Sequence, residues 1–427
     1  MKLPITRLFL CTTAGAADDD FDVSSARNTS PSATPASHTT ASSLHSSLSL
    51  QTLPSVPSLQ SLFLLENYAA VTDLTPSLSS SLSLSSPITA LSLYGDLLYA
   101  SAAHQINVYD SSTLAHIQTF NSNGVSTGNV KAVAFCDGKV LTAHQDGKIR
   151  VWKLTTASKG RQRHKLILTL PTVTDLLRRF PLPKNHVRVR RHRKRLWVEH
   201  YDAVSGLTVG PNGYLYSVSW DKTLKVWAPK LGFRCLESVT AHDDAVNAVT
   251  VSVDGTVYTG SADGRIRVWA KPGSQKRYLR VATLEMHKSA VNALALSVDG
   301  SILFSGACDR SILVWEREDS AKYMAVSGAL RGHDGAILCL INVSYFLISG
   351  SADRTVRIWR RGHEGRFDCL SVLVGHLKPV KSIAARMEGE EGISVFSGGL
   401  NGDIKVWKVK FNSRYCSYSD NTELNYY

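Results

Sequence analysis

The chain has 427 residues, of which 43% are hydrophobic, so it can bury a sizeable core and is not disordered throughout. It has no run of the roughly 18 consecutive apolar residues that a membrane-spanning helix needs, and its seven cysteines form no pair with metal-ligand spacing. Transmembrane helices and zinc fingers are therefore excluded. The scattered cysteines indicate a reducing compartment, and we expect the protein in the cytoplasm and nucleus.

The net charge of +13 is concentrated in one segment. Residues 153–198 contain fourteen Lys or Arg and a single acidic residue, Asp175, so the rest of the chain is balanced. A uniformly basic surface would predict general affinity for nucleic acid. Here the basic character belongs to one segment only.

The two ends of the chain differ in composition from the middle. A short apolar stretch near the N-terminus resembles a secretory signal, but Arg7 interrupts it and Asp18 follows closely, so we do not expect a signal peptide. Residues 1–60 are rich in Ser, Thr and Pro and predict a disordered tail. Residues 412–427 are polar without periodicity, and we expect a second disordered tail there.

A repeated unit occupies the middle of the chain. Six segments such as TGSADGRIRVW end in tryptophan, and the spacings between successive tryptophans are 75, 42, 46, 44 and 48 residues. Upstream, Tyr109 stands 43 residues before Trp152, where another tryptophan is expected, which makes seven units. Within a unit, short alternating apolar runs separated by Gly-containing turns predict a β-meander.

Each of the last five units also carries a histidine, a hydroxyl residue, an acidic or amide residue and the tryptophan at matching spacing. The five sets are His200, Ser217, Asp221 and Trp227; His242, Thr259, Asp263 and Trp269; His287, Ser305, Asp309 and Trp315; His333, Ser349, Asp353 and Trp359; and His376, Ser397, Asn401 and Trp407. An indole N–H can only donate a hydrogen bond and a carboxylate can only accept one, so a hydroxyl and an imidazole can connect them.

A catalytic triad is the alternative interpretation of a recurring His, Ser and Asp. A catalytic site would need the set once, whereas it recurs in five units, so we interpret it as structural. The sequence also shows no Gly-rich phosphate loop and no paired carboxylates outside the repeats. We therefore expect no enzyme activity, no cofactor and no metal site.

These units resemble the WD40 family, whose repeats form four-stranded blades of a closed propeller. The resemblance implies an all-β, seven-bladed propeller over residues 61–411, with the polar sets locking each blade. Two units depart from the pattern: the Trp152 unit has Ser126 where the histidine belongs, and the Tyr109 unit has Ala103 in place of Asp. We therefore expect the first blades to be the least stable.

The last blade lacks an outer strand, because only a polar tail follows IKVWKVKF. We expect a strand between Leu62 and Leu84 to close the ring. The segment FLLENYAAV and the serine-leucine run after it remain equal candidates.

The long gap between the second and third units contains an insertion at about residues 171–200. Asp175 or Thr174 can cap a short helix there, which Pro181 and Pro183 would end. In propeller topology such a connection lies on the top face beside the central channel. The segment VRVRRHRKRLWVEHYDAVSGL resembles the plant WD-repeat group named for JINGUBANG, which implies a non-enzymatic regulator acting through protein partners.

The basic run in this insertion has three interpretations: a nuclear-import signal, a docking surface for an acidic protein segment or nucleic-acid backbone, and a solvated loop without a partner. The candidate partner-binding residues are Arg188, Arg190, Arg191, Arg193, Lys194, Arg195 and Trp220. Trp220 precedes Asp221 at the expected channel mouth, where it is either an exposed interaction residue or packed beneath the insertion.

We therefore predict a protein-interaction scaffold or regulatory adaptor with partners such as transcription factors, signalling proteins or an import receptor, and no membrane contact. Direct nucleic-acid binding through the insertion remains an alternative. A substrate receptor of a cullin-type ubiquitin ligase is another, but no tryptophan is followed by the WDxR pattern. The WRRG at residues 359–362 does not match the FRRG motif of phosphoinositide-binding propellers.

Overall fold

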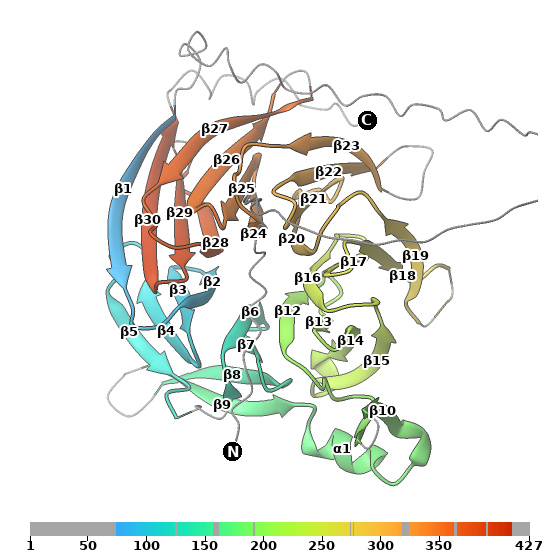
Figure 1. The fold of residues 1–427 in the computed structure, drawn as a ribbon. Helices are drawn as coiled ribbons and strands as arrows, with labels where there is room; N and C mark the ends of the chain where they lie inside the picture. Colours follow the sequence, from blue (N-terminus) through green and yellow to red (C-terminus); the bar gives the residue numbers. More distant parts are fainter. Residues whose placement is uncertain are drawn as a thin grey trace, which may run out of the picture. The chain divides into compact units, whose positions relative to one another are not determined.

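The computed structural model describes residues 74–123, 127–156, 162–190, 193–273, 275, 277–317, 324–362, 365–389 and 392–411. The two tails and the candidate strand FLLENYAAV lie outside the described residues. Within them the chain forms seven four-stranded antiparallel sheets, arranged as blades around a central axis (Figure 1). The expected seven-bladed β-propeller is confirmed.

Blades 1 to 3 follow one another with the inner strand first. Blade 1 contains β2 (Ile88–Tyr94), β3 (Leu97–Ala102), β4 (Gln105–Asp110) and β5 (His116–Phe120); blade 2 contains β6 (Val130–Cys136), β7 (Lys139–His144), β8 (Ile149–Thr156) and β9 (Gln162–Leu170); blade 3 contains β12 (Val204–Val209), β13 (Leu215–Ser219), β14 (Thr223–Ala228) and β15 (Arg234–Thr240).

Blades 4 to 6 repeat this order. Blade 4 contains β16 (Val246–Val251), β17 (Val257–Ser261), β18 (Ile266–Ala270) and β19 (Leu279–Leu284); blade 5 contains β20 (Val291–Leu296), β21 (Ile302–Ala307), β22 (Ile312–Arg317) and β23 (Met324–Leu330); blade 6 contains β24 (Ile337–Val343), β25 (Phe346–Ser351), β26 (Thr355–Arg361) and β27 (Phe367–Val374).

Blade 7 is assembled from both ends of the described chain. Its inner three strands are β28 (Val380–Met387), β29 (Gly392–Gly399) and β30 (Asp403–Phe411), and its outer strand is β1 (Leu74–Ser83). β1 pairs antiparallel with β30, from Leu74 opposite Phe411 to Ser83 opposite Asp403. The serine-leucine run therefore closes the ring, as one of the two expected alternatives.

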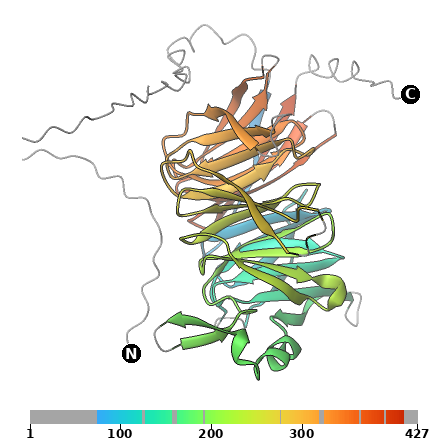
Figure 2. The same cartoon turned by 90° about the vertical axis from the view of Figure 1, so that its right-hand side faces the viewer.

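The insertion between blades 2 and 3 contains the helix α1 (Val173–Arg179), the 3-10 turn η3 (Pro183–Asn185) and the hairpin of β10 (His186–Arg190) and β11 (Arg193–Leu196). A further 3-10 turn, η4 (Pro229–Leu231), joins β14 to β15. In the edge-on view the blades form a disc, with the insertion at one edge (Figure 2).

The core lies between neighbouring blades rather than at one centre. Each strand has apolar side chains on the face that packs against the next blade, and the buried clusters combine residues of two adjacent blades. One such cluster unites Val151 of blade 2, Val204 of blade 3 and Leu196 of the insertion. Short turns join the second and third strands of the blades, and some need a left-handed residue: at Gly147, between β7 and β8, φ is +78° and a Cβ would lie 2.7 Å from the His200 carbonyl oxygen.

Candidate functional site

Blades 3 to 6 each contain the complete hydrogen-bonded set. In blade 3, the Trp227 indole N–H donates to the Ser217 hydroxyl at 2.9 Å, the hydroxyl lies 2.8 Å from His200 Nε2, and His200 Nδ1 lies 2.9 Å from Asp221 Oδ2. The corresponding contacts in blades 4, 5 and 6 measure 2.7–3.0 Å. Because the carboxylate can only accept, Nδ1–H donates to it, and the hydroxyl, which accepts from the indole N–H, donates to Nε2.

Each Asp in these sets joins two turns of one face. Asp221 accepts from the backbone N–H of Tyr201, which precedes the inner strand, and from that of Thr223, which begins the third strand. Asp353 makes the equivalent bonds to Asp334 and Thr355. The sets therefore fix the turns of the face where one blade connects to the next, which we call the top face.

The pKa values of these carboxyl groups are held low. Burial alone would raise the pKa of Asp263, but the hydrogen bond and the charge interaction with His242 more than offset it and lower the pKa to about 2. The same balance holds the pKa values of Asp221, Asp309 and Asp353 well below their usual range. These carboxylates therefore remain ionised and paired, and they serve as fixed acceptors rather than as proton donors.

Blade 7 has the expected departure at Asn401. Trp407 and His376 still meet at the Ser397 hydroxyl, at 2.9 and 2.7 Å. The buried Nδ1 of His376 has no hydrogen-bond partner within the described residues. Asn401 instead donates to Asp403 Oδ2 at 2.5 Å, so the amide is turned to a neighbour in its own turn.

Blade 2 contains a histidine that the repeat pattern did not identify. Ser126, the expected substitute, lies outside the described residues. His144, two residues beyond Thr142 on the same strand, lies 2.7 Å from the Thr142 hydroxyl, to which Trp152 donates at 2.9 Å. Burial, the main cause, and the nearby Arg150 lower the pKa of His144 to about 3. The alternation of β7 could have revealed it, because residues two apart share one face of a strand.

In blade 1, Tyr109 is buried and pairs with Leu98, in the register that Trp227 and Leu215 have in blade 3. The hydroxyl position is occupied by Ala100, and Ala103 lies in a two-residue turn with φ +53°. The blade-1 counterparts of the hydroxyl and the Asp of the set are therefore alanines, as the sequence indicated for Ala103.

The insertion leaves and rejoins the propeller at the top face, as expected, but it does not lie beside the central channel. The Asp175 carboxylate accepts from the backbone N–H of Cys235 on the outer strand β15, and Arg179 donates to the Cys235 carbonyl. α1 is therefore at the outer rim of blade 3 (Figure 1). The reason is packing: Leu196 and Val198 fill the space between blades 2 and 3 and draw the insertion outward.

The helix cap also differs from expectation. Thr172 is the N-cap, and its hydroxyl accepts from the Asp175 N–H at 3.2 Å. Asp175 is buried and forms an ion pair with Arg179 at 2.6 Å. Asp175 therefore attaches the helix to the blade instead of capping it.

The candidate basic residues have different environments. Arg188 pairs with Lys194, and Arg190 with Arg193, in the backbone register of the hairpin, whereas Arg191 lies outside the described residues. Lys194 is exposed. Arg195 is not free, because it donates to the His200 carbonyl at 3.3 Å and lies 3.8 Å from a Glu199 carboxylate oxygen. Arg195 thus supports the turn that leads into blade 3.

Trp220 lies at the mouth of the channel on the top face. Its backbone N–H donates to the carbonyl of Ala203, just before inner strand β12. Its ring is part-buried, and Lys131 Nζ of the neighbouring inner strand β6 lies 5.0 Å from the ring centroid. The ring of Trp220 thus contacts the neighbouring blade 2. Its role in binding stays a prediction.

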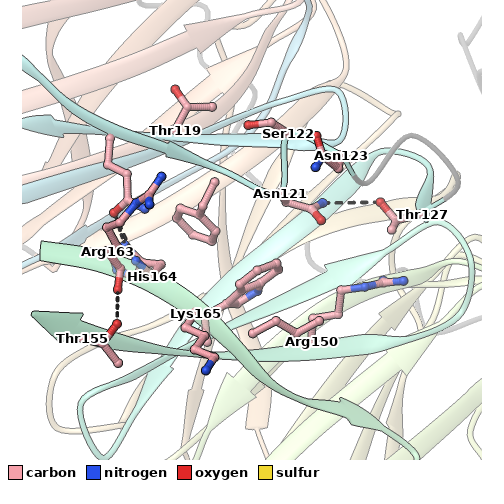
Figure 3. Close-up of a pocket in the computed structure, with 14 residues that line it drawn as sticks. Thr119, Asn121, Ser122, Asn123, Thr127, Arg150, Thr155, Arg163, His164 and Lys165 are labelled. Atoms are coloured by element: carbon pink, nitrogen blue, oxygen red, sulfur yellow. Dashed lines mark hydrogen bonds between the residues drawn. The ribbon is translucent and has the colours of Figure 1, made fainter. Parts of the chain in front are cut away.

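A shallow hollow of about 680 Å³ lies between the outer strands of blades 1 and 2 (Figure 3). His164 lies in it, with Nδ1 2.9 Å from Gln118, Nε2 3.2 Å from the Tyr99 hydroxyl, and its ring stacked on Phe120 at 4.6 Å. Burial lowers the pKa of His164 to about 4, so it is neutral and joins the two blades. Among the described residues no group of His, Cys, Asp and Glu is arranged to hold a metal ion.

The ring of seven four-stranded blades defines the chain as a β-propeller. The family model described as "WD domain, G-beta repeat" matches residues 193–228, 233–270, 279–316, 325–360 and 367–408. The first segment holds β11 and the three inner strands of blade 3, and each later segment holds the outer strand of one blade and the three inner strands of the next. The chain therefore carries WD40 repeats, and WD40 propellers are generally non-enzymatic scaffolds that bind other proteins. Blades 1 and 2, with their altered sets, lie outside the matched segments. No curated protein matches the chain. No helix among the described residues is long and apolar enough to cross a membrane.

Proposed function

We propose that this protein is a non-enzymatic scaffold or regulatory adaptor that docks an acidic, apolar segment of a partner on the insertion at the rim of blade 3. A role in signalling or transcriptional regulation, in the cytoplasm and nucleus, belongs to the same proposal. Membership of the JINGUBANG group is also part of this proposal, and it is supported by the resemblance of the insertion sequence. The observation that supports docking is a row of exposed apolar side chains within the basic segment.

The apolar row lies on the outward face of the insertion. Val173 and Leu177 of α1 and its C-cap residue Phe180 are spaced by four and three residues and share one face, exposed by 69%, 67% and 67%. Leu182 and Val187 follow, exposed by 46% and 48%. Large apolar side chains gathered outside the core are typical of interaction sites.

The charge around this row favours an acidic occupant. The exposed Arg178, Lys184 and Lys194 flank the apolar side chains, and we call these eight residues the rim surface. Asp175 is the one carboxylate between Val173 and Lys194; it is buried against Arg179 and cannot neutralise them, and Glu199 lies beside Arg195. A partner segment with both carboxylates and apolar side chains would complement the rim surface in charge and in hydrophobicity.

A labelled peptide of alternating leucines and glutamates tests the proposal by fluorescence anisotropy with the full chain. We expect saturable binding that weakens with salt and is lost in both V173S/L177S/F180S and R178Q/K184Q/K194Q. The matched control is V253S/V298S/L377S, which removes three equally exposed side chains from other turns. A peptide with glutamines in place of glutamates should bind much more weakly. Equal binding by wild type and both rim variants would contradict the proposal.

Nuclear import is a second candidate, supported by the same basic run. The backbone pairing of β10 with β11 holds part of this run in a hairpin, whereas import receptors need an accessible extended segment. Docking is therefore the function that the geometry supports better.

A further inference from the structure

The second residues of the inner strands form hydrogen bonds between neighbouring blades at the channel. In four blades the side chain of this residue donates to the carbonyl of the first residue of the next inner strand. These bonds join Thr89 to Val130, Ser205 to Val246, Asn247 to Val291 and Asn292 to Ile337, at 2.5–3.0 Å. The polar ring therefore links neighbouring blades at the top of the channel.

Three residues interrupt this ring: the apolar Leu338 in blade 6 and two lysines. Lys131 and Lys381 are the second residues of β6 and β28, on either side of β2, and both are part-buried. Within the described residues neither ammonium group has a hydrogen bond or an ion pair. The Lys131 ammonium group lies over the Trp220 ring, and the thiols of Cys339 and Cys308 favour the charged form of Lys381.

Two part-buried lysines without a carboxylate partner among the described residues are unfavourable for folding. Burial, followed by repulsion from Lys381, lowers the pKa of Lys131, and burial lowers that of Lys381. Two ammonium groups that repel each other away from bulk water destabilise a fold unless an opposite charge compensates them. The neighbouring blades show that Thr, Ser or Asn at this position would instead gain a hydrogen bond.

We propose that the top mouth of the channel is an anion site in which Lys131 and Lys381 bind a phosphoryl group of a ligand, with Trp220 beside it. A phosphoryl group carries a charge of about −1.5 to −2 at neutral pH, which matches two lysines, whereas a carboxylate would neutralise only one. Lysine binds phosphate as a point charge and needs no rigid geometry. This site is separate from the rim surface and does not depend on it.

Thermal unfolding of the full chain in phosphate or pyrophosphate, against chloride at equal ionic strength, tests the site. We expect pyrophosphate to raise the melting temperature of the wild type saturably. The variant K131M/K381M should melt higher than wild type in chloride and show no response to pyrophosphate. The control K148M/K288M removes two exposed lysines from top-face turns and should respond like the wild type.

The charge-preserving variant K131R/K381R separates loss of charge from loss of fold and should keep the response. By calorimetric titration, K131M/K381M should bind pyrophosphate at least roughly tenfold more weakly than wild type. Competition between pyrophosphate and a phosphoserine peptide then distinguishes a free anion from a phosphorylated partner. No response in the wild type, or an equal response in K131M/K381M, would overturn the proposal. Failure of the rim variants would leave it unaffected.

Discussion

Single residues decide whether a blade's hydrogen-bonded set is complete, and blade 7 shows this most directly. In blade 6, Asp353 accepts from both His333 and the Thr355 hydroxyl two residues on. In blade 7 the same two positions are Asn401 and Asp403, so the carboxylate has moved by two residues. There it accepts from Asn401 and from Ser83 of the closing strand, while His376 Nδ1 stays unpaired.

The first prediction is that these two positions act together. N401D alone places two carboxylates side by side and should destabilise the protein, whereas N401D/D403T copies blade 6 and should restore the acceptor for His376. We expect the free energy of unfolding of the double variant, measured with urea, to be higher by about 1 kcal/mol or more than the sum of the two single changes predicts. Additive effects in this double-mutant cycle would show that His376 does not use the carboxylate.

The second prediction concerns His144, which is fully buried beside Thr142. H144A should destabilise the protein by roughly 1–3 kcal/mol, because the Thr142 hydroxyl then loses its buried acceptor. H116A, at an exposed histidine, should change the free energy of unfolding by less than about 0.5 kcal/mol. Equal unfolding midpoints for the two variants would exclude a structural role for His144.

At the scale of elements, the insertion shows where sequence reasoning succeeds and where it ends. The short helix, its end before Pro181 and the basic run were predictable, because they depend on neighbours in sequence. The cap and the position of the insertion were not, because they depend on the burial of Asp175 against Cys235 and of Leu196 between two blades. Lys131 and Lys381 were missed for a similar reason, since their meaning depends on where each inner strand begins.

The third prediction separates import from docking. R190Q/R191Q/R193Q/K194Q should leave the fold intact, because glutamine keeps an aliphatic stem at each position and the core clusters of the described residues contain none of the four. Arg195 is kept because it supports the turn at His200. If the run is an import signal, the nuclear fraction of a fluorescent fusion falls while acidic-peptide binding is retained; if it docks a partner, the reverse occurs.

The matched control for that experiment is K148Q/K230Q/K288Q/K378Q, which removes four exposed lysines elsewhere. It should change neither localisation nor peptide binding. Should the four-residue variant of the basic run also change neither, the run is a solvated loop without either role.

For the whole molecule, the number of blades could be predicted because the tryptophan spacing repeats, and one covalent chain must close into a ring. The choice of closing strand could not, because β1 meets a partner more than 300 residues away and its serines carry little hydrophobic signal. Buried titratable groups occur in several blades, so acid should lower the free energy of unfolding of the whole ring and not of one blade alone.

The fourth prediction is therefore a two-stage loss of stability with acid. His144, His164 and His376 have folded pKa values of about 3, 4 and 4, below the usual 6.5, so the unfolded chain takes up more protons as the pH falls below 6.5. The lowered Asp pKa values, about 2 for Asp263, add a second loss below about pH 4. Urea midpoints should decline between pH 7 and 5 and then more steeply; a constant midpoint over that first interval would contradict this.

The fifth prediction tests ring closure by truncation. Removing residues 1–58 leaves β1 in place and should hardly change the melting temperature. Removing residues 1–86 deletes β1 and exposes the edge of β30, so the melting temperature should fall by many degrees. Equal effects of the two truncations would show that β1 does not close the ring.

The distance between β1 and β30 along the chain also governs how the protein is made. During translation β1 leaves the ribosome before any blade, and its partner strand is complete only at Phe411. A nascent strand that stays unpaired during this time can pair with strands of other chains. Pro76 interrupts it, its register shifts between Leu78 and Ser80, and five of its ten residues are serine. These features reduce the tendency of β1 to aggregate while it is unpaired during synthesis, before the last strand emerges and the ring closes.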